Sequence, residues 1–312
     1  MLNEKWSLER LLGIGGMAAV YAARHRNGAR AAIKILHADL SSSDEIRERF
    51  QREGYAANRV DHPGAVRVLD DDVIGSGPDA GVAYLVMELL QGESLHDRLE
   101  RGLPFGEREF LIIAEAVLEV LVAAHARGVV HRDLKPENVF LVTASSAPGL
   151  DGEGSASGAR VKVLDFGLAR LIHGQAITSH GLALGTPSFM SPEQASGKTD
   201  EIDGRTDLFA LAATGFRLRA GRRIHEGANP VELVTKMANI AAPRIRTVAP
   251  DVSESFARVV DRGLEFRRED RYPSAAAMRE DVARARREID ALAITHVGPA
   301  FARTGASTGE PT

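Results

Sequence analysis

The segment 131–138, which reads HRDLKPEN, constrains this chain of 312 residues more than any other part of it. Asp133 is a carboxylate that can take a proton from a hydroxyl group, and Asn138 offers an oxygen that can hold a metal ion. This spacing puts both groups on one loop, which suits phosphoryl transfer. Charged residues also crowd many solvated loops, so other segments must distinguish a reactive loop from an ordinary one.

Three other segments fall in the order that transfer from a nucleotide would need. Residues 12–20, LGIGGMAAV, form a glycine-rich turn between two strand-like runs, whereas a dinucleotide-binding loop would open directly into a helix. Residues 31–35, AAIKI, are an apolar strand that carries Lys34. Residues 163–170, VLDFGLAR, place Asp165 directly after a hydrophobic strand. Together the four segments indicate that 131–138 is a loop for phosphoryl transfer and not an ordinary solvated loop.

These segments resemble the protein kinase superfamily over about residues 6–288, and most closely its bacterial eukaryotic-like serine/threonine branch. Residues 131–138 match the catalytic loop of that family. Residues 163–170 match its metal-binding Asp-Phe-Gly element, and residues 31–35 match its strand with the phosphate-binding lysine. In the glycine-rich turn, Ala18 replaces the third glycine of the family pattern.

The resemblance continues through the second half of the chain. Residues 185–194, GTPSFMSPEQ, resemble the segment that closes the activation loop, with Ser191 in place of an alanine. Asp207 resembles the helix aspartate that braces the catalytic loop. Arg271 resembles the arginine that pairs with the glutamate at Glu193.

The implied architecture is an α+β, two-lobed protein-kinase-like fold. A small antiparallel β-sheet with one main helix would form the N-lobe (6–88), and a hinge would follow at 88–92. A larger, mainly α-helical C-lobe would occupy 93–288. Low-complexity residues 143–159 predict a flexible insertion within a hairpin of the C-lobe, and 297–312 predict a disordered tail.

The main N-lobe helix is predicted from a capping-box pattern at Ser42 and Glu45, followed by apolar residues at helical spacing. Glu53 falls on the same apolar stripe, where a carboxylate needs a cationic partner. The resemblance implies that this partner is Lys34. A turn at Asn27-Gly28 is expected to join two of the strands.

The resemblance implies that ATP binds between the lobes with Mg²⁺. Lys34, held by Glu53, would bind the α and β phosphates, Asp133 would deprotonate the hydroxyl, and Lys135 would support the γ-phosphate. The predicted catalytic residues are therefore Asp133, Lys135, Lys34 and Glu53, and the predicted metal ligands are Asn138 and Asp165. The predicted nucleotide-binding residues are Leu12, Gly13, Gly15, Gly16, Val20, Ala32, Lys34, Met87, Glu88, Leu90, Asn138 and Asp165.

The function that follows is a serine/threonine protein kinase that also phosphorylates its own activation loop. Thr178 and Ser179 are the predicted sites, because they lie in a polar stretch in the middle of that loop. Arg132, which precedes the catalytic aspartate, would pair with the added phosphate through its planar fork of donors. Trans-autophosphorylation would involve a homodimer.

Composition sets limits on other functions. The absence of cysteine excludes disulfides, thiol catalysis and cysteine metal sites. A net charge of −4 without a basic run argues against nucleic acid as a partner, and protein substrates with serine or threonine are expected instead. We find no apolar stretch that would span a membrane and no signal-peptide pattern, so the predicted location is the cytoplasm.

Two other functions are compatible with this type of fold. A pseudokinase scaffold would bind partners without turnover, and such proteins commonly lack the lysine or one of the two aspartates that this chain has at Lys34, Asp133 and Asp165. A small-molecule phosphotransferase, such as an aminoglycoside kinase, would lack Lys135 in this context and the segment 185–194.

Residues 211–225 depart from the family pattern, because the usual Pro-Phe pair is lost. Gly215 falls inside a predicted central helix, where glycine costs about 1 kcal/mol relative to alanine. Arg217 and Arg219 would need acidic partners or solvent if that helix is buried. Lower stability or an altered substrate shelf is therefore expected in this region.

Overall fold

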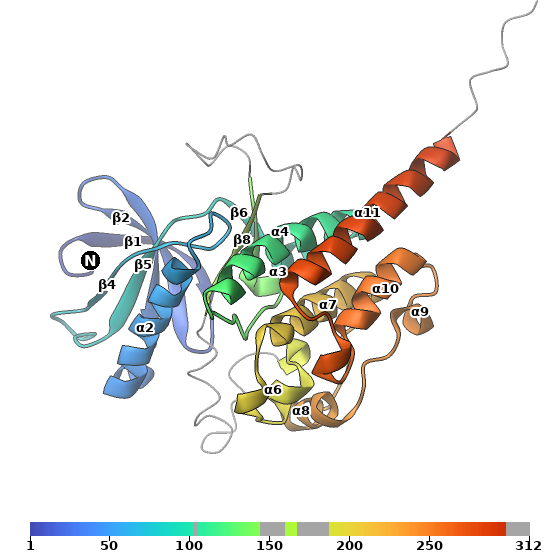
Figure 1. The fold of residues 1–312 in the computed structure, drawn as a ribbon. Coiled ribbons are helices and arrows are strands. Elements are labelled where there is room, and N and C mark those ends of the chain that lie inside the picture. Colours follow the sequence, from blue (N-terminus) through green and yellow to red (C-terminus); the bar gives the residue numbers. More distant parts are fainter. Residues whose placement is uncertain (103–104, 144–159, 167–186, 298–312) are drawn as a thin grey trace, which may run out of the picture.

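A computed structural model describes the chain in residues 1–102, 105–143, 160–166 and 187–297. Figure 1 shows a strand-rich N-terminal part with one long helix beside it and a C-terminal part that consists mainly of helices. The α+β, two-lobed prediction is therefore confirmed. Except for Thr143 and Val297, the residues predicted as an insertion and as a tail lie outside the described residues.

The N-lobe contains a five-stranded antiparallel sheet with the strand order β1-β2-β3-β5-β4. The predicted turn joins β2 and β3, where Gly28 has a φ of 93° and the Asn27 side chain accepts a hydrogen bond from the Ala29 N–H (3.0 Å). Glycine suits this left-handed backbone because it has no Cβ. The strands are β1 (Trp6–Ile14), β2 (Ala18–His25), β3 (Arg30–Leu36), β4 (Val68–Val73) and β5 (Ala83–Met87).

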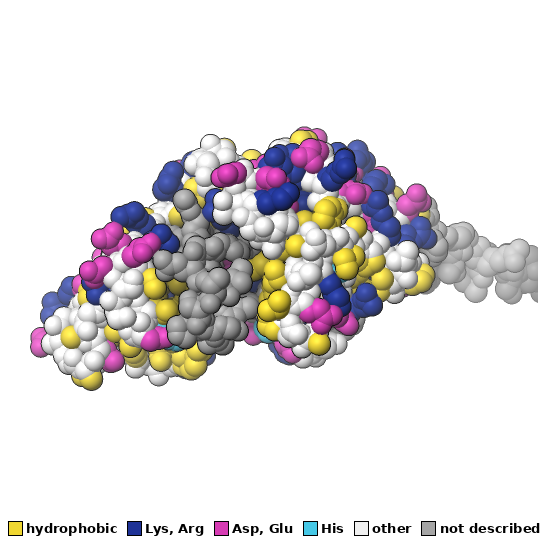
Figure 2. All heavy atoms as spheres, turned by 90° about the horizontal axis from the view of Figure 1, so that it is seen from below, with side chains coloured by type: hydrophobic (Ala, Val, Ile, Leu, Met, Phe, Trp, Pro, Cys, Tyr) yellow, Lys and Arg dark blue, Asp and Glu magenta, His cyan; other side chains and the backbone are white. Residues whose placement is uncertain are grey.

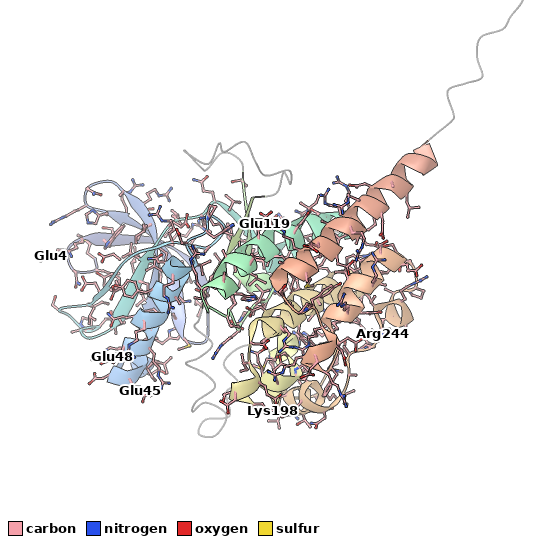
Figure 3. The ribbon with its side chains drawn as sticks, viewed as in Figure 1. Glu4, Glu45, Glu48, Glu119, Lys198 and Arg244 are labelled. Atoms are coloured by element: carbon pink, nitrogen blue, oxygen red, sulfur yellow. The ribbon has the colours of Figure 1, made fainter. Side chains whose placement is uncertain are left out.

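The central strands of this sheet bury apolar side chains on both faces, because side chains along a strand alternate between the faces, whereas the edge strand β1 is mostly exposed. Ala32 and Leu85 belong to the large core that includes Phe50 of helix α2 (Asp44–Val60). Ile33 and Val86, which follow Ala32 and Leu85 in sequence, belong to a separate small cluster. Charged residues of α2 that face solvent, such as Glu45 and Glu48, project from its outer side (Figure 3).

Helix α2 begins one residue later than the capping-box pattern predicts. The Ser43 hydroxyl accepts a hydrogen bond from the Ile46 N–H (3.4 Å) and caps the helix. Ser42 instead ends the short helix α1 (Ala38–Ser41), and its hydroxyl donates to the Asp39 carbonyl (2.7 Å). The prediction of Ser42 as the cap was wrong, because the sequence offers adjacent serines and the preceding turn uses the first of them.

The C-lobe begins with a small antiparallel sheet in the order β6-β7-β8 and continues as helices. Helix α11 packs along α4 (Figure 1), and among the described residues no helix is long and apolar enough to cross a membrane. The elements are β6 (Gly92–Ser94), α3 (Leu95–Glu100), α4 (Glu107–Ala126), β7 (Val139–Val142), β8 (Arg160–Val163), α6 (Pro192–Ala195), α7 (Gly204–Ala220), α8 (Pro230–Asn239), α9 (Ile245–Val248), α10 (Glu254–Gly263) and α11 (Ala275–Val297). Short 3₁₀ turns lie at Pro136–Asn138, Pro187–Phe189, Thr199–Glu201 and Arg268–Asp270.

The glycine inside α7 has a packing role. A Cβ on Gly215 would lie 2.7 Å from the ring of Phe110 on α4 and 3.3 Å from Val260 on α10, so only glycine lets the three helices approach this closely. Arg217 and Arg219, near the end of α7, also find partners. Arg219 pairs with Asp251 (2.9 Å), and Arg217 donates to the Gly221 carbonyl (3.2 Å). The departure from the family pattern in this region is therefore accommodated by packing and hydrogen bonding.

We expect Gly215→Ala to lower the free energy of unfolding. The added methyl group would overpack the α4–α7 contact at a cost of about 1–3 kcal/mol. This cost outweighs the usual gain of about 1 kcal/mol for alanine in a helix. Denaturant unfolding measures the difference. As the control, the same substitution in a Phe110→Leu background should cost less, because the clashing ring is gone. Stabilisation by Gly215→Ala in the wild-type background would contradict this account of the packing.

Candidate active site

The loop 131–138 is anchored on helix α7 by Asp207, whose side chain is completely buried. Asp207 accepts hydrogen bonds from the backbone N–H of His131 (2.9 Å) and of Arg132 (2.8 Å). A third partner is His125, whose Nε2 lies 2.8 Å from an Asp207 oxygen. A buried carboxylate needs such donors. The resemblance correctly predicted that Asp207 braces the loop, whereas His125 was not foreseen.

Arg132 has a left-handed backbone with a φ of 67°. For a residue with a long side chain this conformation costs about 1–3 kcal/mol, and it persists only when surrounding contacts enforce it. Its N–H is held by Asp207, and its carbonyl accepts a hydrogen bond from the Gln194 side chain (2.7 Å). The next residue, Asp133, is thereby presented from a backbone that is fixed on both sides.

The polar groups of the loop converge on the carboxylate of Asp133. Lys135 Nζ lies 2.7 Å from an Asp133 oxygen, and the Asn138 amide donates both to the Asp133 carbonyl (2.8 Å) and to its carboxylate (3.2 Å). Burial lowers the pKa of Lys135, but the Asp133 carboxylate outweighs burial and the net pKa is raised. Lys135 therefore stays cationic beside the carboxylate.

The end of strand β8 lies against this loop. The Leu164 N–H donates to the Asn138 carbonyl (2.9 Å), and the Leu164 carbonyl lies 2.7 Å from His131 Nε2. The His131 ring also packs on Phe166, with 4.7 Å between ring centroids. These contacts hold Asp165, which lies between Leu164 and Phe166, next to the catalytic loop.

Asp165 pairs with Lys34, which lies on β3 of the other lobe (2.6 Å). Burial raises the pKa of the Asp165 carboxyl, but the nearby Lys34 ammonium outweighs burial, so the net pKa lies below its usual value. The predicted ion pair between Lys34 and Glu53 is a different contact. Glu53 lies on α2, but its side chain is outside the described residues.

The sheet register brings several of the predicted nucleotide-binding residues together. Val20 lies opposite Lys34 in the β2–β3 pair, and Ala32 lies opposite Met87 in the β3–β5 pair. The turn after β1 closes with a hydrogen bond from the Gly15 N–H to the Ala18 carbonyl (2.9 Å). The predicted set in this turn and its strands comprises Leu12, Gly13, Gly15, Gly16 and Val20, all between β1 and β2 or on them.

A histidine that the sequence analysis did not identify supports this turn. His37 follows β3, and its Nε2 lies 2.8 Å from the Gly15 carbonyl. The backbone N–H of His37 donates to the Met17 carbonyl (2.8 Å). No local pattern in the sequence marks His37, because the contact depends on the pairing of β2 with β3.

At the hinge, the Glu88 carboxylate is engaged by neighbouring strands. It accepts hydrogen bonds from Lys162 on β8 (2.6 Å) and from the Arg67 N–H (2.7 Å). The Glu88 N–H also donates to the Arg67 carbonyl (3.0 Å). The Glu88 side chain and its backbone N–H are therefore already engaged, which leaves the Glu88 carbonyl for a ligand. Lys162 was not identified from the sequence, although a lysine between two apolar residues of a strand is a signal for a buried pair.

Short helix α6 includes the end of the predicted segment 185–194, which closes the activation loop. Glu193 forms two hydrogen bonds with Arg271 (2.9 and 2.8 Å), as the resemblance implied, and a third with the Thr206 hydroxyl (2.8 Å). Its neighbour Gln194, which received no role from the sequence, reaches the catalytic loop. The candidate phosphorylation sites Thr178 and Ser179 and residues 185–186 lie outside the described residues.

Comparisons with known proteins agree with this geometry. Serine/threonine-protein kinase Pkn1 of Myxococcus xanthus is 39% identical over 276 residues, which cover 87% of this chain and 37% of that protein. PknB of Mycobacterium tuberculosis is 31% identical over 289 residues, which cover 91% of this chain and 43% of that protein. The chain thus spans less than half the length of either relative.

Among solved structures, the kinase domain of PknI from Mycobacterium tuberculosis is similar, with a TM-score of 0.66 and 26% identity, over 91% of this chain and 97% of that domain. The family model described as the protein kinase domain matches residues 6–282. This match includes both lobes, the catalytic loop on Asp207 and the Glu193–Arg271 pair. The chain belongs to the protein kinase domain family.

Proposed function

We propose that this chain is a serine/threonine protein kinase that transfers the γ-phosphate of ATP to hydroxyl groups of proteins. One observation carries the proposal. Asp133, with Lys135 and Asn138 on its carboxylate, lies on the same loop that holds the end of β8 and hence the Lys34–Asp165 pair. The proton acceptor, the cations and the oxygen donors of phosphoryl transfer thus meet at one place, where positioning and electrostatics supply most of the catalysis.

In this proposal Asp133 accepts the proton of the attacking hydroxyl. Its carboxylate already accepts hydrogen bonds from Lys135 and Asn138, which fix its direction. We also assign Lys135 to the γ-phosphate, because its ammonium lies beside the Asp133 carboxylate that would meet the attacking hydroxyl. The raised pKa of Lys135 keeps that charge in place near neutral pH.

The adenine ring would meet the hinge through its backbone. The Glu88 side chain is held by Lys162, away from this role, so the Glu88 carbonyl and the Leu90 N–H are the groups that we assign to adenine. The phosphates would meet Lys34 and the glycine-rich turn. A Cβ on Gly13 would have no neighbour within 4 Å, so this turn has open space for a ligand.

Magnesium fits the donor set beside Asp133. Asp165 and Asn138 offer hard oxygen atoms, and the Asn138 amide nitrogen faces Asp133, which leaves its oxygen for a cation. Among the described residues no group of three or more acidic, histidine or cysteine side chains could hold a metal. Two protein ligands suit an ion whose other ligands are phosphates and waters. Bound there, Mg²⁺ would offset negative charge on the phosphates.

The proposed partners are protein substrates with serine or threonine. The face in Figure 2 shows Lys and Arg side chains interspersed with Asp and Glu, which favours proteins over nucleic acid as partners. Because the reaction consumes ATP, we propose the cytoplasm as its location. Autophosphorylation at Thr178 or Ser179, in a homodimer, stays a prediction.

The pseudokinase alternative predicts nucleotide binding without transfer. We expect Asp133→Asn to lower autophosphorylation about 100- to 10,000-fold, because the proton acceptor is lost. Asp200→Asn, on an exposed residue, is the matched control and should retain activity. Transfer of labelled phosphate from ATP and thermal melting are measured in parallel. Turnover by Asp133→Asn within tenfold of the wild type would remove the proposed base, and wild-type protein without turnover would favour the scaffold.

Lys34→Met tests the phosphate-binding group. The loss of the ammonium should raise the KM for ATP and lower kcat, since Lys34 is expected to bind phosphates in both the ground state and the transition state. Lys198→Met is the matched control, because Lys198 is exposed and forms a surface ion pair with Glu201 (Figure 3). Unchanged ATP kinetics in Lys34→Met would contradict the assignment.

We expect Mg²⁺ to bind weakly to the free protein and ATP to bind more tightly when Mg²⁺ is present. The reason is that the protein contributes only Asp165 and Asn138 to an octahedral ion. Calorimetric titrations with each ligand alone and with both together measure this coupling. Tight binding of Mg²⁺ in the absence of nucleotide would show a more complete protein site than the proposed pair.

A further inference from the structure

We propose that Gln194 is a positioning residue of the catalytic loop, which fixes the peptide unit between Arg132 and Asp133. This inference rests on the proposed kinase function. The motif that contains Gln194 was assigned to the end of the activation loop, and this side chain had no role in it. Its contact with the catalytic loop gives it one.

The Gln194 amide is buried and has a partner at each end. Its Nε2 donates to the Arg132 carbonyl (2.7 Å), and its Oε1 accepts from the Ser191 N–H (3.1 Å) and hydroxyl (3.3 Å). An N–H group can only donate and a carbonyl can only accept, so these partners fix the orientation of the amide. A carboxylate could serve Ser191 but could not donate to Arg132.

The carbonyl that Gln194 holds belongs to the same planar peptide unit as the Asp133 N–H. That N–H donates to His131 Nδ1 (3.3 Å), so the unit is held at its oxygen by α6 and at its nitrogen by the loop itself. A rotation of this plane would move the Cα of Asp133. Because the left-handed φ of Arg132 is a sparsely populated conformation, its relaxation toward negative φ would turn this plane once one restraint is lost.

The helix that carries Gln194 is itself fixed in the C-lobe. The neighbouring Glu193 is buried and bonded to Arg271 and Thr206, so α6 cannot shift without breaking these bonds. The restraint on Arg132 from α6 is therefore rigid. Together with Asp207 on α7, Gln194 holds Arg132 by both its N–H and its carbonyl.

The variant Gln194→Glu preserves size and the acceptor for Ser191 while it replaces the N–H donor by a carboxylate, whose charge is removed again at low pH. We expect kcat to fall about 10- to 100-fold, since small misplacements of a reacting group have effects of this size. The KM for ATP should change by less than about threefold, because the nucleotide meets other residues. Ser191→Ala, which leaves the Gln194 donor intact, is the matched control and should retain kcat.

The pH dependence separates positioning from stability. A protonated glutamic acid can donate to the Arg132 carbonyl, and its position against a carbonyl in a buried site favours the neutral form. The ratio of kcat in Gln194→Glu to kcat in the wild type should therefore rise as the pH falls from about 8 to about 6. The melting temperatures of the two proteins, measured at each pH, show whether stability changes in parallel.

Three outcomes would overturn the proposal. The first is that Gln194→Glu has the kcat of the wild type, and the second is that its kcat falls only in parallel with its melting temperature. The third is that the KM for ATP rises by the same factor by which kcat falls. Hydrogen exchange of residues 131–138 gives a readout that needs no turnover. It should be faster in Gln194→Glu than in the wild type, and equal exchange would also overturn the proposal. If the exchange of Gln194→Glu is faster than that of the wild type but the wild type transfers no phosphate, the kinase function is refuted and the positioning role is not.

Discussion

The buried carboxylate of Asp207 is the interaction on which the rest of the site depends. Its oxygens accept from two consecutive backbone N–H groups of the catalytic loop and face His125. Without these donors the charge would be costly inside the C-lobe, and without the charge the left-handed turn at Arg132 would have no restraint on its N–H. Helix α7 thus determines where Asp133 lies, although no atom of α7 belongs to the reacting groups.

Contacts between residues that are close in sequence can be related to short motifs, because the chemistry of those residues is visible in the motif. Lys135 and Asn138 both donate to the carboxylate of Asp133, and the predicted Asn27-Gly28 turn joins two strands. Roles carried by the family resemblance, such as Asp207 and the Glu193–Arg271 pair, were also confirmed. The contacts that were missed join distant segments: Lys162 with Glu88, His37 with Gly15, and Gln194 with Arg132. Such pairs depend on the register of strands and on helix packing, which no single motif contains. The error at Ser42 has a local cause, since two adjacent serines can each cap a helix.

Two ion pairs, each with a buried cation, stabilise the C-lobe and its contact with the hinge. Arg271 and Glu193 bury both charges and satisfy them with further bonds, which ties the region after the activation loop to the helical core. Between β8 and the hinge, the buried Lys162 pairs with the partly exposed Glu88. Removing one partner of such a pair leaves an uncompensated charge, so each position tolerates little change even though neither pair includes a proposed catalytic residue.

The contact between Lys34 and Asp165 has a consequence for motion. One residue belongs to the N-lobe sheet and the other follows a C-lobe strand, so this ion pair joins the lobes, as the pair of Arg127 with Asp61 also does. ATP with its cation would draw the same two charges apart, the lysine toward phosphate and the aspartate toward the metal. Breaking of the ion pair and entry of the nucleotide would then be one coupled equilibrium, in which the relative orientation of the lobes responds to the ligand.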